Sequence, residues 1–243
     1  CNRDSINYFG LYFIKMNFLV AGGSGYLGSE IVHYLLGKKH RVLNVDVNDL
    51  QISNVDYNFR KINISKKSEL ANFFNNIDVV IHSVAKVPLV KNDKEFENTN
   101  ILGTKNLLEL SLKHKIKKFV YISSSAVYGI SGKSPITEES ERYPCEKYGL
   151  SKKIGEDLCF EFINKGLNTS IIRPRTVIGG KRLGIFSVLF WWINNNKKIP
   201  VINGGNNLYQ FVDVNDLVNA IYLSSFFEKS EDFNIGAEKY LSI

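Results

Sequence analysis

The sequence is poor in the residues that build disulfide frameworks and metal sites. Its 243 residues include only 3 cysteines and 4 histidines. Cys1, Cys145 and Cys159 show no CxxC spacing, which disfavours a disulfide scaffold and favours a reducing, cytoplasmic setting. The histidines are scattered and form no HxxxH motif, so no metal site is expected.

Long hydrophobic runs are also missing. No segment approaches the ~20 consecutive apolar residues of a membrane-spanning helix, so no membrane association is expected. The apolar stretch YFGLYFI at 8–14 is short, lacks a small-residue cleavage site and continues through Lys15. Met16 is a plausible natural start, and we therefore expect residues 1–15 to be an N-terminal extension outside the fold.

Positive charge is in modest excess, with 31 Lys and Arg against 24 Asp and Glu and a net charge of +7. These residues are spread along the chain rather than gathered in one stripe. The densest run, KHKIKK at 113–118, lies where a helix pattern gives way to a strand pattern, as in a solvated helix end. No nucleic-acid partner is expected.

Apolar runs of strand length alternate with stretches of helical period, which is typical of βαβ units and a parallel sheet. We expect strands at 17–21, 41–46, 57–64, 78–85, 118–124 and 168–174, and helices at 26–37, 67–75, 93–113 and 146–165. After Pro174 the pattern loosens into a helix at 184–195, an extended segment at 211–212, a helix at 216–227 and a strand at 233–237. The expected fold is α/β, a Rossmann doubly wound parallel sheet. Its nucleotide-binding domain spans 16–174, and a small, truncated C-terminal lobe at 175–243 is partly interleaved with the sheet.

A glycine-rich turn follows the first expected strand and opens the first expected helix. Gly22, Gly25 and Gly28 form the spacing GxxGxxG. This arrangement permits a tight turn, close approach to a pyrophosphate and close helix packing. Asp46, at the end of the second strand, can accept hydrogen bonds from a ribose and would repel a 2′-phosphate. Because no Arg follows Asp46 directly, the sequence favours NAD over NADP.

Three residues suggest alcohol chemistry. Tyr148 and Lys152 have the spacing i and i+4 and project from one helix face. A cation beside a phenol lowers its pKa, so that Tyr148 can take the proton of a substrate hydroxyl. Ser124 lies at the carboxyl end of the fifth strand, where open parallel sheets bind ligands and where its hydroxyl can hold the reacting oxygen.

Together these features resemble the extended short-chain dehydrogenase/reductase family, in particular its NAD-dependent epimerase/dehydratase branch. The matching stretches are GGSGYLG at 22–28, DVVIHSVAK at 78–86, NTNILGTKNLLE at 98–109, VYISSSAVYG at 120–129, YGLSK at 148–152, IIRPRTVIGG at 171–180, YQFVDVNDLVNAI at 209–221 and NIGAEKYLSI at 234–243. The resemblance implies a catalytic set of Ser124, Tyr148 and Lys152, with Lys152 also holding the nicotinamide ribose. It further implies a homodimer through the helices at 93–113 and 146–165.

The resemblance also implies which residues meet the ligands. The expected cofactor-binding residues are Gly22, Gly25, Tyr26, Leu27, Gly28, Asp46, Asn63, Ile64, Val84, Ala85, Lys86, Asn100, Tyr148, Lys152, Arg173 and Pro174. Within this set, Asn63 and Ile64 fall at adenine, Asn100 matches the family's structural asparagine, and Arg173 and Pro174 close the nicotinamide side. The expected substrate-binding residues are Ser125, Arg175, Thr176 and Arg182.

The two residues that follow Ser124 indicate which reactions of the family this chain can catalyse. Family members that dehydrate sugars carry an Asp-Glu pair at the next two positions, where this chain has Ser125 and Ala126. Sugar dehydration is therefore disfavoured. Epimerisation and a one-way dehydrogenase or reductase step stay open, and we predict an NAD-dependent nucleotide-sugar epimerase or oxidoreductase.

Two alternatives remain. Thr176 and Leu208 replace an Asn and an Arg often found in sugar-nucleotide epimerases, and the helix at 184–195 is aromatic. That helix is expected to pack into the core. If it lined an apolar substrate pocket instead, it would indicate an apolar hydroxyl or ketone substrate. The enzyme would then resemble a 3-beta-hydroxysteroid dehydrogenase or a dihydroflavonol reductase. A catalytically idle NAD-binding protein is disfavoured by the intact Ser124, Tyr148 and Lys152.

Overall fold

The computed structural model describes residues 14–86, 97–130, 134–179, 186–199 and 202–242. At its centre is a seven-stranded parallel sheet in the order β10-β6-β5-β4-β1-β2-β3. The strands are β1 (Asn17–Ala21), β2 (Arg41–Asp46), β3 (Tyr57–Lys61), β4 (Val79–His82), β5 (Lys118–Ile122), β6 (Thr169–Pro174) and β10 (Glu231–Ile235). The strand order reverses between β1 and β4, as in Rossmann folds, so the expected fold class is confirmed.

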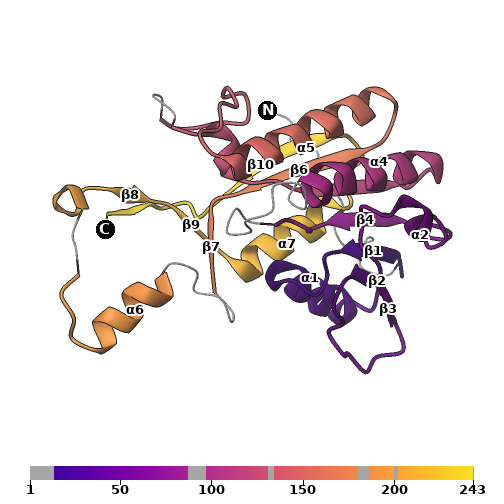
Figure 1. The fold of residues 1–243 in the computed structure, drawn as a ribbon, viewed down its shortest axis with the longest axis horizontal. Helices are drawn as coiled ribbons and strands as arrows, with labels where there is room; N and C mark the ends of the chain where they lie inside the picture. Colours follow the sequence, from indigo (N-terminus) through magenta and orange to yellow (C-terminus); the bar gives the residue numbers. More distant parts are fainter. Residues whose placement is uncertain (1–13, 87–96, 131–133, 180–185, 200–201, 243) are drawn as a thin grey trace.

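Helices cover both faces of this sheet (Figure 1). On one face α1 (Tyr26–Gly37) packs against α7 (Val214–Ser224). On the other lie α2 (Lys67–Ala71), α4 (Gly103–Lys113) and α5 (Lys147–Asn164), with a π-helical turn, η2 (Asn98–Leu102), leading into α4. Strand β10 and helix α7 come late in the chain yet belong to the main body, so the two halves of the sequence are interleaved.

Strand β1 shows how the sequence builds two cores. Successive side chains of a strand point to opposite faces of the sheet. Phe18 and Val20 belong to the core under α1 and α7, whereas Leu19 and Ala21 belong to the core under α2, α4 and α5. All four are fully buried, which explains why β1 is apolar throughout rather than alternating.

A smaller lobe lies beside the carboxyl edge of the sheet (Figure 1). Here β7 (Thr176–Ile178) pairs in parallel with β9 (Phe211–Asp213), and β8 (Leu208–Tyr209) pairs antiparallel with β11 (Leu241–Ser242). The lobe also holds α6 (Phe186–Asn194) and a 3-10 turn, η4 (Ile202–Gly205). The sequence pattern did not indicate β7, β8 or β11, because strands of two or three residues are too short to show a period.

Two packing expectations are wrong. Helix α6 does not pack into the core, since Val188, Phe190, Trp191 and Ile193 are 48–56% exposed. Lys118, at the end of the basic run, is buried rather than solvated. Its Nζ donates to Asn168 Oδ1 and to two backbone carbonyls beyond α7. Tertiary contacts therefore use this lysine to tie the end of α7 to β5.

Candidate functional site

The glycine-rich turn lies where the strand order reverses, at the carboxyl end of β1. A Cβ atom added to Gly28 would overlap the Gly22 carbonyl oxygen, so the start of α1 can approach the turn only with glycine at this position. A Cβ on Gly25 would meet only that same oxygen, at 3.3 Å, because the other side of Gly25 is open. Gly28 is thus needed for packing, whereas Gly25 keeps space free beside the backbone.

Asp46 reaches this turn from the end of β2. Its Oδ2 accepts a hydrogen bond from the Ser24 N–H at 3.0 Å, and its Oδ1 accepts one from the Val47 N–H at 2.6 Å. The carboxylate is thereby held beside the glycine turn, where it could accept hydrogen bonds from the ribose of a bound dinucleotide. This turn is a site in which backbone N–H groups, a helix N-terminus and one carboxylate converge.

A first cavity, of about 400 Å³, joins the glycine turn to the residues proposed for alcohol chemistry. It is lined by Gly25, Tyr26, Leu27, Gly28, Ser83, Ala85, Ile122, Ser123, Ser124, Tyr148, Lys152, Pro174, Arg175 and Val177. Residues more than 120 positions apart in the sequence therefore share one cavity. Ser83 was not anticipated, although its position just after β4 could have indicated it.

Lys152 is held rigidly in the wall of this cavity. It is buried, its Nζ donates to the Ile122 carbonyl at 2.6 Å, and it lies 5.0 Å from the centre of the Tyr121 ring. Burial lowers the pKa of Lys152 to about 8, while the nearby Glu156 opposes this shift. Near neutral pH the ammonium is the main form, so a positive charge lies one helical turn from Tyr148.

Ser124 and Tyr148 are presented by well-defined local structure. Ser124 has an extended backbone and caps the 3-10 turn η3 (Ser125–Tyr128), where its Oγ accepts from the Ala126 N–H at 3.2 Å. Tyr148 lies in the first turn of α5, and its carbonyl accepts from the Ser151 hydroxyl at 2.8 Å. A hydroxyl, a phenol and a cation thus face one cavity, which suits proton transfer to and from an alcohol oxygen.

Asn100 forms hydrogen bonds that connect the segment after β4 to helix α5. Its side-chain amide bonds both the N–H and the carbonyl of Lys86, at 2.9 and 3.0 Å, and reaches Ser151 Oγ at 3.2 Å. It is buried and lines neither cavity described here. Asn100 therefore links the segment after β4 to α5, as expected of the family's structural asparagine, and its cofactor contact stays a prediction.

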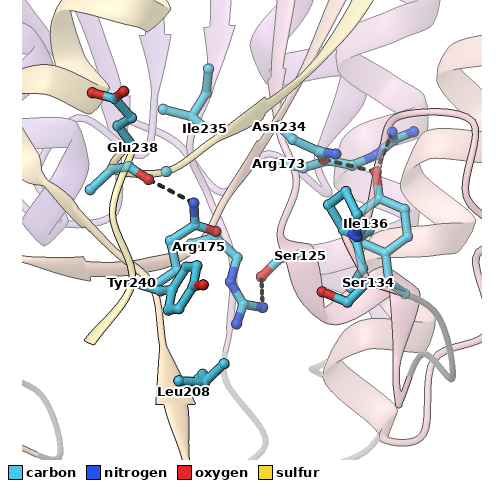
Figure 2. Close-up of a pocket in the computed structure, with 15 residues that line it drawn as sticks. Ser125, Ser134, Ile136, Arg173, Arg175, Leu208, Asn234, Ile235, Glu238 and Tyr240 are labelled. Carbon is cyan, nitrogen blue, oxygen red and sulfur yellow. Dashed lines mark hydrogen bonds between the residues drawn. The ribbon is translucent and has the colours of Figure 1, made fainter. Parts of the chain in front are cut away.

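A second cavity, of about 480 Å³, adjoins the first through Arg175 (Figure 2). It is lined by Ser125, Tyr128, Ser134, Pro135, Ile136, Arg173, Arg175, Leu208, Gln210, Asn234, Ile235, Gly236, Ala237, Glu238 and Tyr240. Its lining comes from η3, the loop at 134–136, β6, β10 and the lobe. Ser125 and Arg175 were expected at the substrate, and Leu208 also lies here, whereas Gln210, Asn234 and Tyr240 were not anticipated.

Arg173 does not reach the first cavity. Its guanidinium pairs with Glu156 through Nε at 2.9 Å and Nη2 at 3.0 Å, and Nη1 pairs with Asp232 at 2.6 Å. Both Arg173 and Glu156 are fully buried, and these carboxylates keep the pKa of Arg173 raised despite burial. This side chain ties α5 to β6 and β10, and its expected nicotinamide contact stays a prediction. Pro174 does line the first cavity.

Several other predicted residues, among them Val84 and Lys86, lie away from the two cavities or outside the described part. Asn63 is exposed, and its Oδ1 accepts from Ser65. Ile64 is buried against Gly103, so its side chain packs between β3 and α4. Thr176, in β7, pairs with Phe211 of β9 and lines neither cavity. Arg182 lies outside the described residues.

The described residues contain no group of three or more His, Cys, Asp or Glu side chains that could hold a metal ion. Within the same ranges, no helix is long and apolar enough to cross a membrane.

The sheet order and the glycine turn define a dinucleotide-binding protein of the Rossmann class. The chain belongs to the NAD dependent epimerase/dehydratase family, whose model matches residues 18–236. It is 32% identical over 248 residues to a putative UDP-glucose 4-epimerase of Methanocaldococcus jannaschii, covering 93% of this chain and 78% of the relative.

Other relatives show both likeness and a difference in length. An uncharacterised protein of Sinorhizobium fredii, y4nG, is 40% identical over 223 residues, covering 91% of this chain but only 56% of the relative. The chain thus spans little more than half of that protein. The crystal structure of a Thermotoga maritima UDP-glucose 4-epimerase with UDP-glucose superimposes with a TM-score of 0.82 at 27% identity, covering 93% of this chain and 79% of that one.

Proposed function

We propose that the chain is an NAD-dependent nucleotide-sugar epimerase or oxidoreductase that acts by hydride transfer at a sugar hydroxyl carbon. The observation that carries this proposal is the first cavity, in which the glycine turn meets Ser124, Tyr148 and Lys152. The names of the relatives point to C4 of a UDP-sugar as the reacting position.

The site fits NAD in its shape and charge. The open side of Gly25 leaves room for a pyrophosphate beside the N-terminus of α1. Asp46 would accept hydrogen bonds from the adenosine ribose and repel a 2′-phosphate, which favours NAD over NADP. Tyr26, Leu27, Val84, Ala85, Lys86 and Pro174 would complete the cofactor side, with residues 16–174 as the nucleotide-binding domain and 175–243 as the substrate lobe.

In the proposed reaction, the residues of this chain bind the sugar oxygen and transfer its proton. Ser124 would hold the reacting sugar oxygen, and the Tyr148 phenolate would take its proton as the carbon is oxidised to a ketone. Bound NAD supplies the hydride acceptor and donor. The Lys152 ammonium favours the phenolate and would bond the nicotinamide ribose. In an epimerase the ketone is reduced from its other face, and Tyr148 returns the proton to the oxygen.

The side chains of the lobe support a second candidate function. Leu208 lines the second cavity, and the aromatic side chains of α6 are half-exposed. An apolar hydroxyl or ketone substrate would suit such surroundings. Because Ser125 and Arg175 also line this cavity, we place the nucleotide sugar first.

The test combines NAD with a panel of UDP-, dTDP- and GDP-sugars. We expect a sugar epimer to appear in NMR spectra without net NADH absorbance, and Tyr148→Phe to lower kcat by roughly 10²- to 10⁴-fold while NAD still binds. Tyr143→Phe is the matched control, because Tyr143 is 82% exposed and lines neither cavity. No turnover of any sugar by the NAD-bound protein would contradict the proposal.

We also propose a homodimer through the segments 93–113 and 146–165. Leu102 at the end of η2 and Leu150 in α5 are 42% and 49% exposed and supply apolar surface. Light scattering measures the mass directly, and a monomer at micromolar concentration would contradict this assembly.

A further inference from the structure

Helix α5 carries a buried carboxylate one turn beyond Lys152. Glu156 follows Lys152 by four residues, so the two side chains lie on the same face of the helix. Glu156 is fully buried, and a carboxylate removed from water needs partners. Its Oε1 accepts from Arg173 Nε at 2.9 Å, and its Oε2 accepts from Arg173 Nη2 and Arg142 Nη1, each at 3.0 Å. Two guanidiniums therefore hold it in a single position.

The same carboxylate also holds the segment that follows β5. The Ser123 hydroxyl donates to Glu156 Oε1 at 2.5 Å. Just before Ser123, the Ile122 carbonyl accepts from Lys152 Nζ at 2.6 Å. Just after it comes Ser124, whose hydroxyl is proposed to bind the reacting oxygen. Two consecutive residues at the end of β5 thus bond two consecutive turns of α5, and Glu156 fixes the backbone from which Ser124 projects.

Glu156 is the one carboxylate that acts on Lys152 in the described part of the chain. The other ionisable groups around this ammonium are Tyr148 and Cys159 of α5, Tyr121 of β5, His82 of β4 and Arg175 at the wall of the first cavity. Burial raises the pKa values of Tyr121 and Cys159 and lowers the pKa of His82 to about 3, so these three groups are neutral near neutral pH. The negative charge that favours the ammonium therefore comes from Glu156.

The two arginines do not cancel this charge, because each is shared with a second carboxylate. Arg173 Nη1 pairs with Asp232 at 2.6 Å, and Arg142 Nη2 pairs with Asp157 at 2.9 Å. The side chain of Arg142 is also 22% exposed, so water screens its charge. Burial lowers the pKa of Lys152 to about 8, and Glu156 acts against this shift. A neutral residue in place of Glu156 would leave Lys152 where burial favours the uncharged amine.

We propose that Glu156 is a positioning residue for the proposed reaction: its charge keeps Lys152 an ammonium, and its bond to Ser123 orients the segment that carries Ser124. This inference rests on the proposed function, in which the ammonium favours the Tyr148 phenolate. Glu156 lines neither cavity, so it acts only through side chains that do. Loss of its charge should therefore change the pH range in which the site works.

The first measurement is the titration of Lys152 in the folded protein, with and without NAD. NMR of ¹³C-labelled lysine gives the midpoint without turnover, and Lys152→Met identifies the signal. Glu156→Gln keeps the shape of the side chain and removes its charge. We expect the midpoint to fall by roughly 1 pH unit or more, because a nearby opposite charge typically shifts a pKa by about that much. Glu156→Asp, which restores the charge, should restore much of the midpoint.

Turnover of a nucleotide sugar supplies the second readout. The ratio of kcat in the unaltered protein to kcat in Glu156→Gln should grow by roughly 10-fold between about pH 6 and pH 9, as the variant loses its ammonium first. A purely structural loss would be the same at every pH. Arg142→Gln is the matched control, because it breaks the same ion pair while Glu156 stays charged. In this control the Lys152 midpoint should not fall, and any loss of kcat should not depend on pH.

Glu156→Gln leaves Arg173 with one carboxylate fewer in the core, which destabilises the fold. If that variant does not fold, Arg173→Gln is compared with the double variant Glu156→Gln/Arg173→Gln, whose Lys152 midpoint should be the lower of the two. An unchanged midpoint in the comparison made, or a loss of kcat in Glu156→Gln that is equal at every pH, would overturn the inference. If no nucleotide sugar turns over, the proposed function fails, and the midpoint still decides whether Glu156 holds the charge of Lys152.

Discussion

The sheet and the lobe beside it hold their side chains in different ways. Strands β4, β5 and β6 are buried along their whole length, and the residues at their ends are fixed by packing on both faces. In the lobe, β8 and β11 are exposed and α6 is half-exposed. The first cavity belongs mainly to the sheet, whereas much of the second is built by the lobe.

This difference suggests that the proposed catalytic residues and the residues that select the substrate lie in different parts of the molecule. Lys152 is located by burial, by one carbonyl and by an aromatic ring, so its geometry depends on the core. Leu208 and Tyr240 are 62% and 63% exposed, so they can be exchanged without a packing penalty. We infer that substitutions in the sheet mainly affect folding and the chemical step, and that substitutions in the lobe mainly affect substrate choice.

The glycine turn gives the largest expected effect and tests whether packing and binding can be separated within the sheet. Gly28→Ala should destabilise the protein by about 2 kcal/mol or more, because the new Cβ overlaps the Gly22 carbonyl oxygen. Gly25→Ala should fold nearly normally but bind NAD much more weakly, since only the ligand side is blocked. Urea unfolding and NAD titration measure the two effects. Similar losses of stability in both variants would contradict the separation.

His82 gives a smaller effect, which depends on pH. It is fully buried, and its Nε2 lies 2.8 Å from Thr104 Oγ1. The Thr104 hydroxyl donates to the Asn100 carbonyl, so Nε2 must be the protonated nitrogen. Burial, with a contribution from Lys152, lowers the pKa of His82 from 6.5 to about 3. A neutral imidazole therefore belongs to the folded state.

The sign of the pH effect follows from proton counting. Between pH 6.5 and about 3 the unfolded chain binds a proton at His82 that the folded chain does not. The free energy of unfolding should therefore decrease as the pH falls through this window, by up to ~1.4 kcal/mol per pH unit. His82→Gln should reduce this slope in urea unfolding, and exposed His33→Gln should not. Equal slopes in all three proteins would show that His82 is not buried neutral.

Leu208→Arg tests the lobe and has the smallest expected effect. An added cation in the second cavity should strengthen UDP binding by about 10-fold or less, without changing the stability of an already exposed position. Thr176→Asn, outside both cavities, should change UDP binding less. Calorimetry measures both variants. No gain in either would favour the apolar substrate over the nucleotide sugar.

Much of the sheet half could be predicted from sequence. The bounds of β1, α1 and β2 agree with the expected 17–21, 26–37 and 41–46, because their apolar period is strong and glycine closes the helix. Strands expected to reach 64, 85 and 124 end earlier, at Lys61, His82 and Ile122. The residues beyond those ends form loops at the carboxyl edge, where apolar composition alone cannot distinguish a strand from a binding loop.

The sequence by itself predicted the fold class and the glycine turn from local spacing and period, and its resemblance to a known family predicted the NAD-dependent family and the proposed set of Ser124, Tyr148 and Lys152. Only the tertiary structure decided how charged and aromatic side chains are used. It buried Arg173 against Glu156, left α6 half-exposed and placed Arg175 unpaired between two cavities. Whether a charge is neutralised depends on residues distant in sequence that fold next to it, and no local pattern contains that information.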